Sequence, residues 1–206
     1  MKLPRLMIVL DGSVCEDVLY VAREACAAGG RFFQWRHKQA TPREFYETGR
    51  TLAMIVASYN GVLVINDRLD VARALAAQGV HLPANGLPLR AVRSTVGRDR
   101  VVGVSCHDDE EVANTRGDAS YITYSPVFEP NSPKPEGAVI RAVGVEGLAG
   151  AVRRSEAPVY ALGGITPERV SACLEAGAHG VAVLGGINLA EDPFEATLAY
   201  LEALDA

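Results

Sequence analysis

Short apolar runs recur eight times along the chain, and each is followed by a helix or a helix-like stretch. The runs begin near Leu6, Phe32, Val62, Val80, Arg100, Ala119, Pro158 and Gly180. Parallel strands that are buried on both faces are apolar throughout, and eight strand–helix repeats in one domain make a (β/α)8 barrel. We therefore predict an α/β protein with a single (β/α)8 TIM barrel domain over residues 1–206. Because this length is below the usual one, its connections must be short.

The main alternative is an open, doubly wound sheet. That fold often carries a G-x-G-x-x-G fingerprint after its first strand, but here the first run is followed by Asp11-Gly12 and the fingerprint is absent. No long linker or shift in composition divides the chain. The closed barrel is therefore the preferred interpretation.

Charge and cysteine content narrow the function. The net charge of −5 gives no general attraction for nucleic acid or for an anionic membrane. No apolar run is long enough to cross a bilayer, and none of the four cysteines has C-x-x-C spacing. We expect a soluble cytoplasmic protein that acts on small molecules, without nucleic-acid or membrane partners. A homodimer is one option for its oligomeric state.

The third apolar run ends abruptly in polar residues. Val62–Ile65 is followed by Asn66, Asp67 and Arg68, which would lie at the carboxyl end of a strand, where ligands bind in α/β folds. An amide, a carboxylate and a guanidinium suit a phosphate and a divalent metal. Alternatively, Asp67 caps the next helix and Arg68 is solvated. On this triplet alone, the capping interpretation is favoured.

The second run shows an alternation. Gln34, Arg36 and Lys38 are separated by single residues, so in a strand they would face the same side. Two cations and an amide on one face indicate either a strand that lines an anion site or an exposed edge strand. The sequence does not decide between them.

Further candidates lie after later strands. Ser105 and His107 end the fifth run, and His107 alone is more often a structural or capping residue than a catalyst. Residues 125–137 form a long proline-rich connection in which Ser132 and Lys134 either reach a phosphate or face solvent. Two glycine pairs follow the seventh and eighth runs, where barrels often bind phosphate through backbone N–H groups. They are Gly163-Gly164 and Gly185-Gly186.

Seven short segments resemble motifs of thiamine-phosphate synthase and its relative, the thiazole tautomerase TenI. Their order and spacing carry the resemblance from Leu6 to about Ile187. The segments are Gln34-Trp-Arg-His-Lys38, Ile65-Asn-Asp-Arg68, Gly79-Val-His-Leu82, Gly103-Val-Ser-Cys-His107, Ser125-Pro-Val-Phe128, Ala161-Leu-Gly-Gly-Ile165 and Ala178-His-Gly-Val-Ala-Val183.

The resemblance to the synthases implies a specific reaction. A barrel of this family joins hydroxymethylpyrimidine pyrophosphate to thiazole phosphate, and pyrophosphate leaves with the assistance of Mg²⁺. By resemblance, Asp67 would bind Mg²⁺, Gly163 and Gly164 would contact the thiazole phosphate, and Lys38, Ser105 and Lys134 would act in catalysis. The remaining substrate-binding candidates are Gln34, Arg36, Asn66, Ser132, Gly185 and Gly186.

The chain also departs from the family pattern. The synthases usually carry Gly-Gln-x-Asp after the fourth strand, and here Gly86 replaces that second metal carboxylate. Their F-P-T-x-T-K loop is here Phe128-Glu-Pro-Asn-Ser-Pro-Lys134, and Gly185 replaces a serine. The catalytic histidine of TenI corresponds to Pro126.

Three hypotheses follow from this pattern. A synthase with a variant metal site ranks first. The second is a TenI-like isomerase in which His81 or His107 takes the proton. The third is a non-catalytic protein that binds thiazole or thiamine phosphate.

Overall fold

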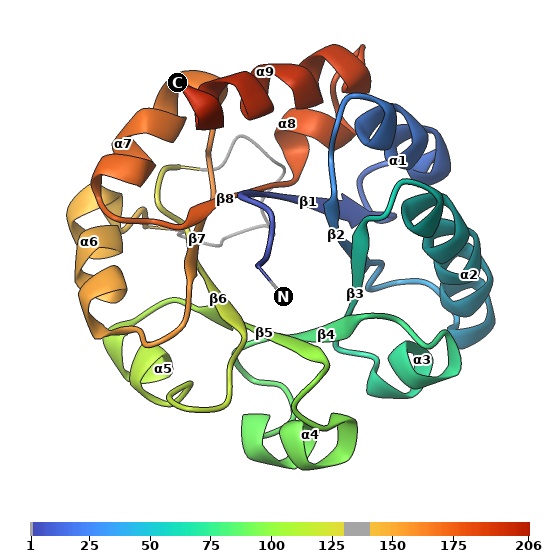
Figure 1. Cartoon of the computed structure of the whole chain (residues 1–206), viewed down its shortest axis with the longest axis horizontal. Helices are drawn as coiled ribbons and strands as arrows, with labels where there is room; N and C mark the ends of the chain where they lie inside the picture. Colours follow the sequence, from blue (N-terminus) through green and yellow to red (C-terminus); the bar gives the residue numbers. More distant parts are fainter. Residues whose placement is uncertain (1, 130–140) are drawn as a thin grey trace.

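The computed structural model describes residues 2–129 and 141–206, and the predictions for Ser132 and Lys134 lie outside these residues. Eight parallel strands close into one barrel in chain order, β1 to β8, and the helices surround it (Figure 1). The predicted (β/α)8 barrel is therefore confirmed, and the open sheet is excluded because β1 pairs with β8 as well as with β2.

The strands follow the eight apolar runs closely. They are β1 (Leu6–Asp11), β2 (Phe32–Arg36), β3 (Val62–Asn66), β4 (Gly79–Leu82), β5 (Val101–Cys106), β6 (Tyr121–Tyr124), β7 (Val159–Leu162) and β8 (Gly180–Val183). The helical segments are α1 (Val18–Ala27), α2 (Pro42–Ser58), α3 (Leu69–Ala74), α4 (Leu89–Val96), α5 (Asp109–Ala113), α6 (Gly144–Arg154), the 3₁₀ turn η1 (Pro167–Arg169), α7 (Val170–Glu175), α8 (Gly185–Asn188) and α9 (Pro193–Asp205).

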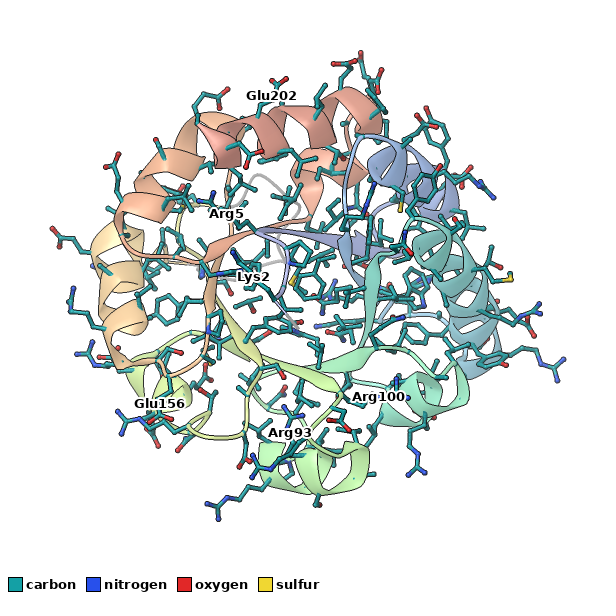
Figure 2. All side chains as sticks on the ribbon, in the orientation of Figure 1. Lys2, Arg5, Arg93, Arg100, Glu156 and Glu202 are labelled. Atoms are coloured by element: carbon teal, nitrogen blue, oxygen red, sulfur yellow. The ribbon has the colours of Figure 1, made fainter. Side chains whose placement is uncertain are left out.

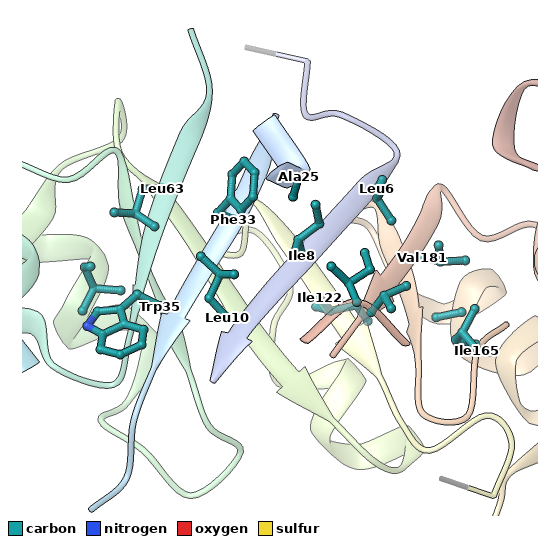
Figure 3. Close-up of a cluster of buried hydrophobic side chains, with 14 of the residues drawn as sticks. Leu6, Ile8, Leu10, Ala25, Phe33, Trp35, Leu63, Ile122, Ile165 and Val181 are labelled. Atoms are coloured by element: carbon teal, nitrogen blue, oxygen red, sulfur yellow. The ribbon is translucent and has the colours of Figure 1, made fainter. Parts of the chain in front are cut away.

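Side chains point alternately to the two faces of each strand, and this divides the core into two parts. Ile8 and Leu10 of β1 face the helices and belong to the same buried cluster as Phe33 of β2 and Leu63 of β3 (Figure 3). Met7 belongs to a separate cluster in the barrel interior. Because neighbouring residues of a strand point to opposite faces, an unbroken apolar run supplies both clusters.

Aromatic rings fill much of the barrel interior. Phe32, Tyr121 and Tyr160 meet edge to face, with ring centroids 5.3 to 5.8 Å apart. Gly103 makes room for them, because a Cβ atom there would lie 2.1 Å from Cζ of Tyr121. The interior is thus a packed core below the carboxyl ends of the strands.

The sequence makes two predictions about helix starts: Ser13 would cap the helix after the first strand, and Thr41, Pro42 and Glu44 would begin the helix after the second. The predicted start of α2 is confirmed, since Thr41 and Glu44 form a reciprocal capping box and Pro42 is the first helical residue. The predicted cap of α1 at Ser13 is wrong. Asp17 caps α1 instead, while the Ser13 N–H donates to Asp11 Oδ1 within the turn that leaves β1.

All four cysteines are free thiols. Burial raises the pKa of Cys106 to about 12 and the pKa values of Cys26 and Cys173 to about 11, so these thiols are protonated and inert at neutral pH. Over residues 2–129 and 141–206, no helix has both the length and the apolar character required to span a bilayer.

Candidate active site

A cavity of about 940 Å³ opens at the carboxyl ends of the strands. Every strand or the loop that follows it contributes to its wall. Leu162 and Leu184 close the side formed by β7 and β8. Six predicted site residues line this one cavity: Gln34, Arg36, Lys38, Asn66, Asp67 and Ser105.

Arg36 is held by a buried carboxylate. Arg36 and Asp11 are direct partners in the register of β2 and β1, and their side chains form an ion pair. Asp11 is only 1% exposed, whereas 26% of the Arg36 side chain is accessible from the cavity. Burial lowers the pKa of the Arg36 guanidinium, yet arginine stays charged at any physiological pH. In the sequence, Asp11 only marks the end of the first apolar run, and nothing there indicates that it pairs with a site residue.

The position of β2 settles the alternative left open for its polar face. β2 pairs with both β1 and β3, so the edge-strand interpretation is wrong. Its polar face lines the cavity instead. Lys38 lies in the loop beyond the end of β2, where it is exposed and still contributes to the cavity wall.

An amide pair forms the neighbouring part of the wall. Gln34 Nε2 donates to Asn66 Oδ1 over 2.8 Å, which links the ends of β2 and β3. Gln34 is buried and Asn66 is half-buried. The bond fixes the orientation of both amides, so that the remaining N–H and C=O groups are preorganised for a polar ligand.

Asp67 has an unusual backbone conformation. Its φ of 61° is left-handed, which is uncommon outside glycine, and its N–H donates to the carbonyl of His81. The capping interpretation is wrong, because α3 begins with Arg68 as its N-cap residue and no side-chain cap bond forms. Arg68 is paired with Asp70 through two hydrogen bonds. Within the described residues, the Asp67 carboxylate makes no ion pair and faces the cavity.

His81 and His107, two of the three histidines in the cavity wall, have different surroundings. His81 is 2% exposed, and its ring nitrogens lie 2.8 Å from the Tyr121 hydroxyl and 2.9 Å from Ser105 Oγ. Burial lowers the pKa of His81 to about 3, so the ring is neutral. His107 accords with its structural interpretation, since its backbone N–H and its ring both contact Glu111 at the start of α5.

The glycine pairs lie next to the cavity but outside its described wall. They directly follow Leu162 and Leu184. Gly163 and Gly164 have positive φ, and a Cβ atom there would lie 2.6 Å from Pro126 and 2.4 Å from the Glu129 carbonyl oxygen, respectively. Close packing of the two loops therefore explains this pair without a ligand. Gly185 and Gly186 begin α8, whose first backbone N–H groups have no earlier turn to bond.

Comparison with known proteins identifies the family. The family model described as thiamine monophosphate synthase matches residues 6–187. The thiamine-phosphate synthase of Salinispora tropica is 39% identical over 98% of both chains. That of Salinibacter ruber is 36% identical over 98% of this chain and 88% of its own. This chain belongs to the thiamine monophosphate synthase family.

Solved structures agree with this assignment. Thiamine phosphate pyrophosphorylase from Pyrococcus furiosus superposes with a TM-score of 0.86 at 30% identity, over 98% of this chain and 95% of that one. The family resemblance inferred from seven short segments is therefore confirmed over nearly the whole chain.

The cavity wall offers few carboxylates for the Mg²⁺ that the resemblance to the synthases implies. Within residues 2–129 and 141–206, no three His, Cys, Asp or Glu side chains cluster as metal ligands. Mg²⁺ often uses only one or two protein carboxylates, together with substrate phosphates and water. Asp67 fits that pattern, because Asp11 and Glu111 are already paired. Asn85, which sequence reasoning did not select, lines the cavity in the altered loop after β4 and adds an amide oxygen.

Proposed function

We propose that this protein is a thiamine-phosphate synthase that joins hydroxymethylpyrimidine pyrophosphate to thiazole phosphate and releases pyrophosphate. The observation that carries the proposal is the convergence of all six described polar candidates from β2, β3 and β5 on one cavity. Homologues of high coverage that carry the same name support the same reaction.

The cations would act on the leaving group. As the bond to the pyrimidine methylene breaks, negative charge grows on pyrophosphate, and fixed positive groups beside it lower the barrier. Arg36 is suited to this role because Asp11 holds it in place before substrate arrives. Lys38, on a loop, can follow the leaving group as it departs.

The proposal includes Mg²⁺ at Asp67. The Asp67 carboxylate would hold the ion beside the leaving group, and Asn85 in the same cavity wall could add an amide oxygen. When bound, Mg²⁺ would neutralise developing charge on the pyrophosphate oxygens. The left-handed backbone of Asp67 supports this role, because backbone conformations that are uncommon outside glycine gather at functional sites.

The remaining groups would hold the two rings and the second phosphate. The Gln34–Asn66 pair and Ser105 would bind the pyrimidine substrate, while backbone N–H groups of the glycine pairs would contact the thiazole phosphate. Ser132 and Lys134 keep their predicted roles from the family resemblance. A homodimer and a cytoplasmic location also stay predictions.

The tautomerase hypothesis has less support. Neither proposed replacement base is free, since His81 is neutral and bonded through both ring nitrogens and His107 is engaged with Glu111. The corresponding TenI histidine position is occupied by Pro126.

The direct test is thiamine phosphate formation from the two substrates with excess Mg²⁺. Lys38→Ala should lower turnover by at least about tenfold, the loss of one charge-assisted contact in the transition state. Lys2→Ala is the matched control, because Lys2 lies at the opposite end of the barrel from the cavity. Its neighbours there are residues that precede the strands, and Figure 2 labels it near the middle of the view. Wild-type protein that forms no product, or equal effects of the two variants, would refute the proposal.

A further inference from the structure

His81, Gly103 and Tyr121 lie side by side at one level of the barrel. The register pairs His81 of β4 with Gly103 of β5, and Gly103 with Tyr121 of β6. The Tyr121 ring passes over Gly103 and reaches His81, two strands away, with its hydroxyl 2.8 Å from Nδ1. A Cβ atom at Gly103 would lie 2.4 Å from that hydroxyl, so the contact depends on glycine at this position.

The Tyr121 hydroxyl determines which nitrogen of His81 carries the proton. Tyr121 is fully buried, and Nδ1 of His81 is its one hydrogen-bond partner among the described residues. Burial also raises the pKa of Tyr121, so the phenol keeps its proton. A protonated Nδ1 would donate to the Tyr121 oxygen and leave the buried O–H of Tyr121 without an acceptor, which is costly. Tyr121 therefore donates to Nδ1, and the proton of the neutral ring resides on Nε2.

This tautomer sets the direction of the next hydrogen bond. Nε2 lies 2.9 Å from Ser105 Oγ, so the ring N–H donates to the serine oxygen. The Ser105 hydroxyl proton is therefore not donated to His81. In the described residues it has no other acceptor, and Ser105 lines the cavity.

We propose that Tyr121 and His81 are positioning residues that fix the Ser105 hydroxyl as a hydrogen-bond donor directed into the cavity. Its target is a lone pair on the pyrimidine substrate, either a ring nitrogen or a pyrophosphate oxygen. The identity of that substrate rests on the proposed function. With the opposite tautomer, Ser105 would donate to His81 and offer the cavity only an acceptor, which would repel both targets.

The tautomer can be read directly in the free protein by long-range ¹H–¹⁵N correlation of the histidine rings at neutral pH. Comparison with His81→Gln assigns the His81 signals among the four histidines. We expect a neutral ring protonated on Nε2. A ring protonated on Nδ1, or on both nitrogens, would overturn the inference whatever the enzymatic activity is.

Steady-state kinetics test whether Tyr121 acts on Ser105 through His81. Tyr121→Phe should lower kcat/KM for thiamine phosphate formation by about tenfold, which corresponds to about 1.4 kcal/mol, and should change the tautomer signals of His81. Tyr160→Phe is the matched control. It removes a hydroxyl from the same aromatic cluster, but that hydroxyl donates to the Pro4 carbonyl, so kcat/KM should change by less than about twofold.

The double variant separates positioning from general damage. If Tyr121 acts through Ser105, Tyr121→Phe should have almost no further effect in a Ser105→Ala background. Full additivity of the two effects would contradict the inference. Wild-type protein without synthase activity would refute the proposed function, and the tautomer measurement would then decide the inference alone.

Discussion

Replacing Asp11 with asparagine tests whether the buried ion pair organises the cavity mouth. The new amide would keep an oxygen for the Ser13 N–H, which now donates to Asp11 Oδ1 over 2.9 Å. The substitution would remove the negative charge beside Arg36. The guanidinium would then stay in a partly desolvated position without its counter-ion.

The structure sets the size of the effect. Removing one partner of a fully buried pair costs about 3–5 kcal/mol. Because 26% of the Arg36 side chain is exposed, solvent recovers part of that loss, and we expect about 2–3 kcal/mol of lost stability. Urea unfolding followed by circular dichroism measures it as a lower midpoint at unchanged slope.

Glu47→Gln provides the matched control. Glu47 and Arg50 form an ion pair of 2.9 Å on α2, but more than half of each side chain is exposed. Their contribution should stay below about 0.5 kcal/mol and disappear at high salt, whereas the Asp11 effect should persist. Equal losses for the two variants would refute the claim that burial makes the Asp11–Arg36 pair important.

Three further predictions concern stability. Gly103→Ala should cost about 1–3 kcal/mol in urea unfolding, because the added Cβ forces the Tyr121 ring to move, and no loss would contradict the packing argument. Thr41→Ala should cost about 1 kcal/mol in the same assay by breaking the capping box with Glu44, and an unchanged midpoint would contradict it. The pKa of His81 is about 3 in the folded protein and about 6.5 in the unfolded chain, so between these pH values only the unfolded chain binds the proton. The free energy of unfolding should therefore fall on acidification, by about 1.4 kcal/mol per pH unit. An equally steep fall in His81→Gln would show that His81 is not the cause.

The barrel was predictable because its strands carry a strong signal. A strand such as Val62–Asn66 is buried on both faces until its last residue. An apolar run followed by polar residues therefore marks both the strand and the rim, which is the end of the barrel formed by the carboxyl ends of the strands. The helix starts were less certain, because Ser13 and Asp17 are both good caps and only the turn at Asp11 selects between them.

The supporting residues of the site could not be read from the sequence. Asp11 and Arg36 are 25 positions apart, and only the register of β1 and β2 makes them neighbours. The contact of Tyr121 with His81 crosses an intervening strand and depends on the missing side chain of Gly103. Local patterns identify which residues reach the rim, whereas these contacts depend on how the barrel closes.

The charge balance at the rim gives a reason for a metal. Within the described residues, both arginines of the cavity wall are already paired, Arg36 with Asp11 and Arg68 with Asp70, while the Glu111 carboxylate contacts the His107 ring. Lys38 and Asp67 remain, and their charges cancel. The protein alone therefore offers little net attraction to a highly charged pyrophosphate, and a divalent cation at Asp67 would supply it.

Removal of the charge at Asp67 and at Asp70 should have opposite effects on pyrophosphate binding. By calorimetry, Mg²⁺ should tighten the binding of inorganic pyrophosphate by at least about tenfold, and Asp67→Asn should remove that increment. Asp70→Asn should instead tighten binding without Mg²⁺, because it removes the carboxylate charge that pairs with Arg68. If pyrophosphate bound equally well with and without Mg²⁺, or if both variants behaved alike, Arg36 and Lys38 would hold the anion unaided and Asp67 would have no part in metal binding.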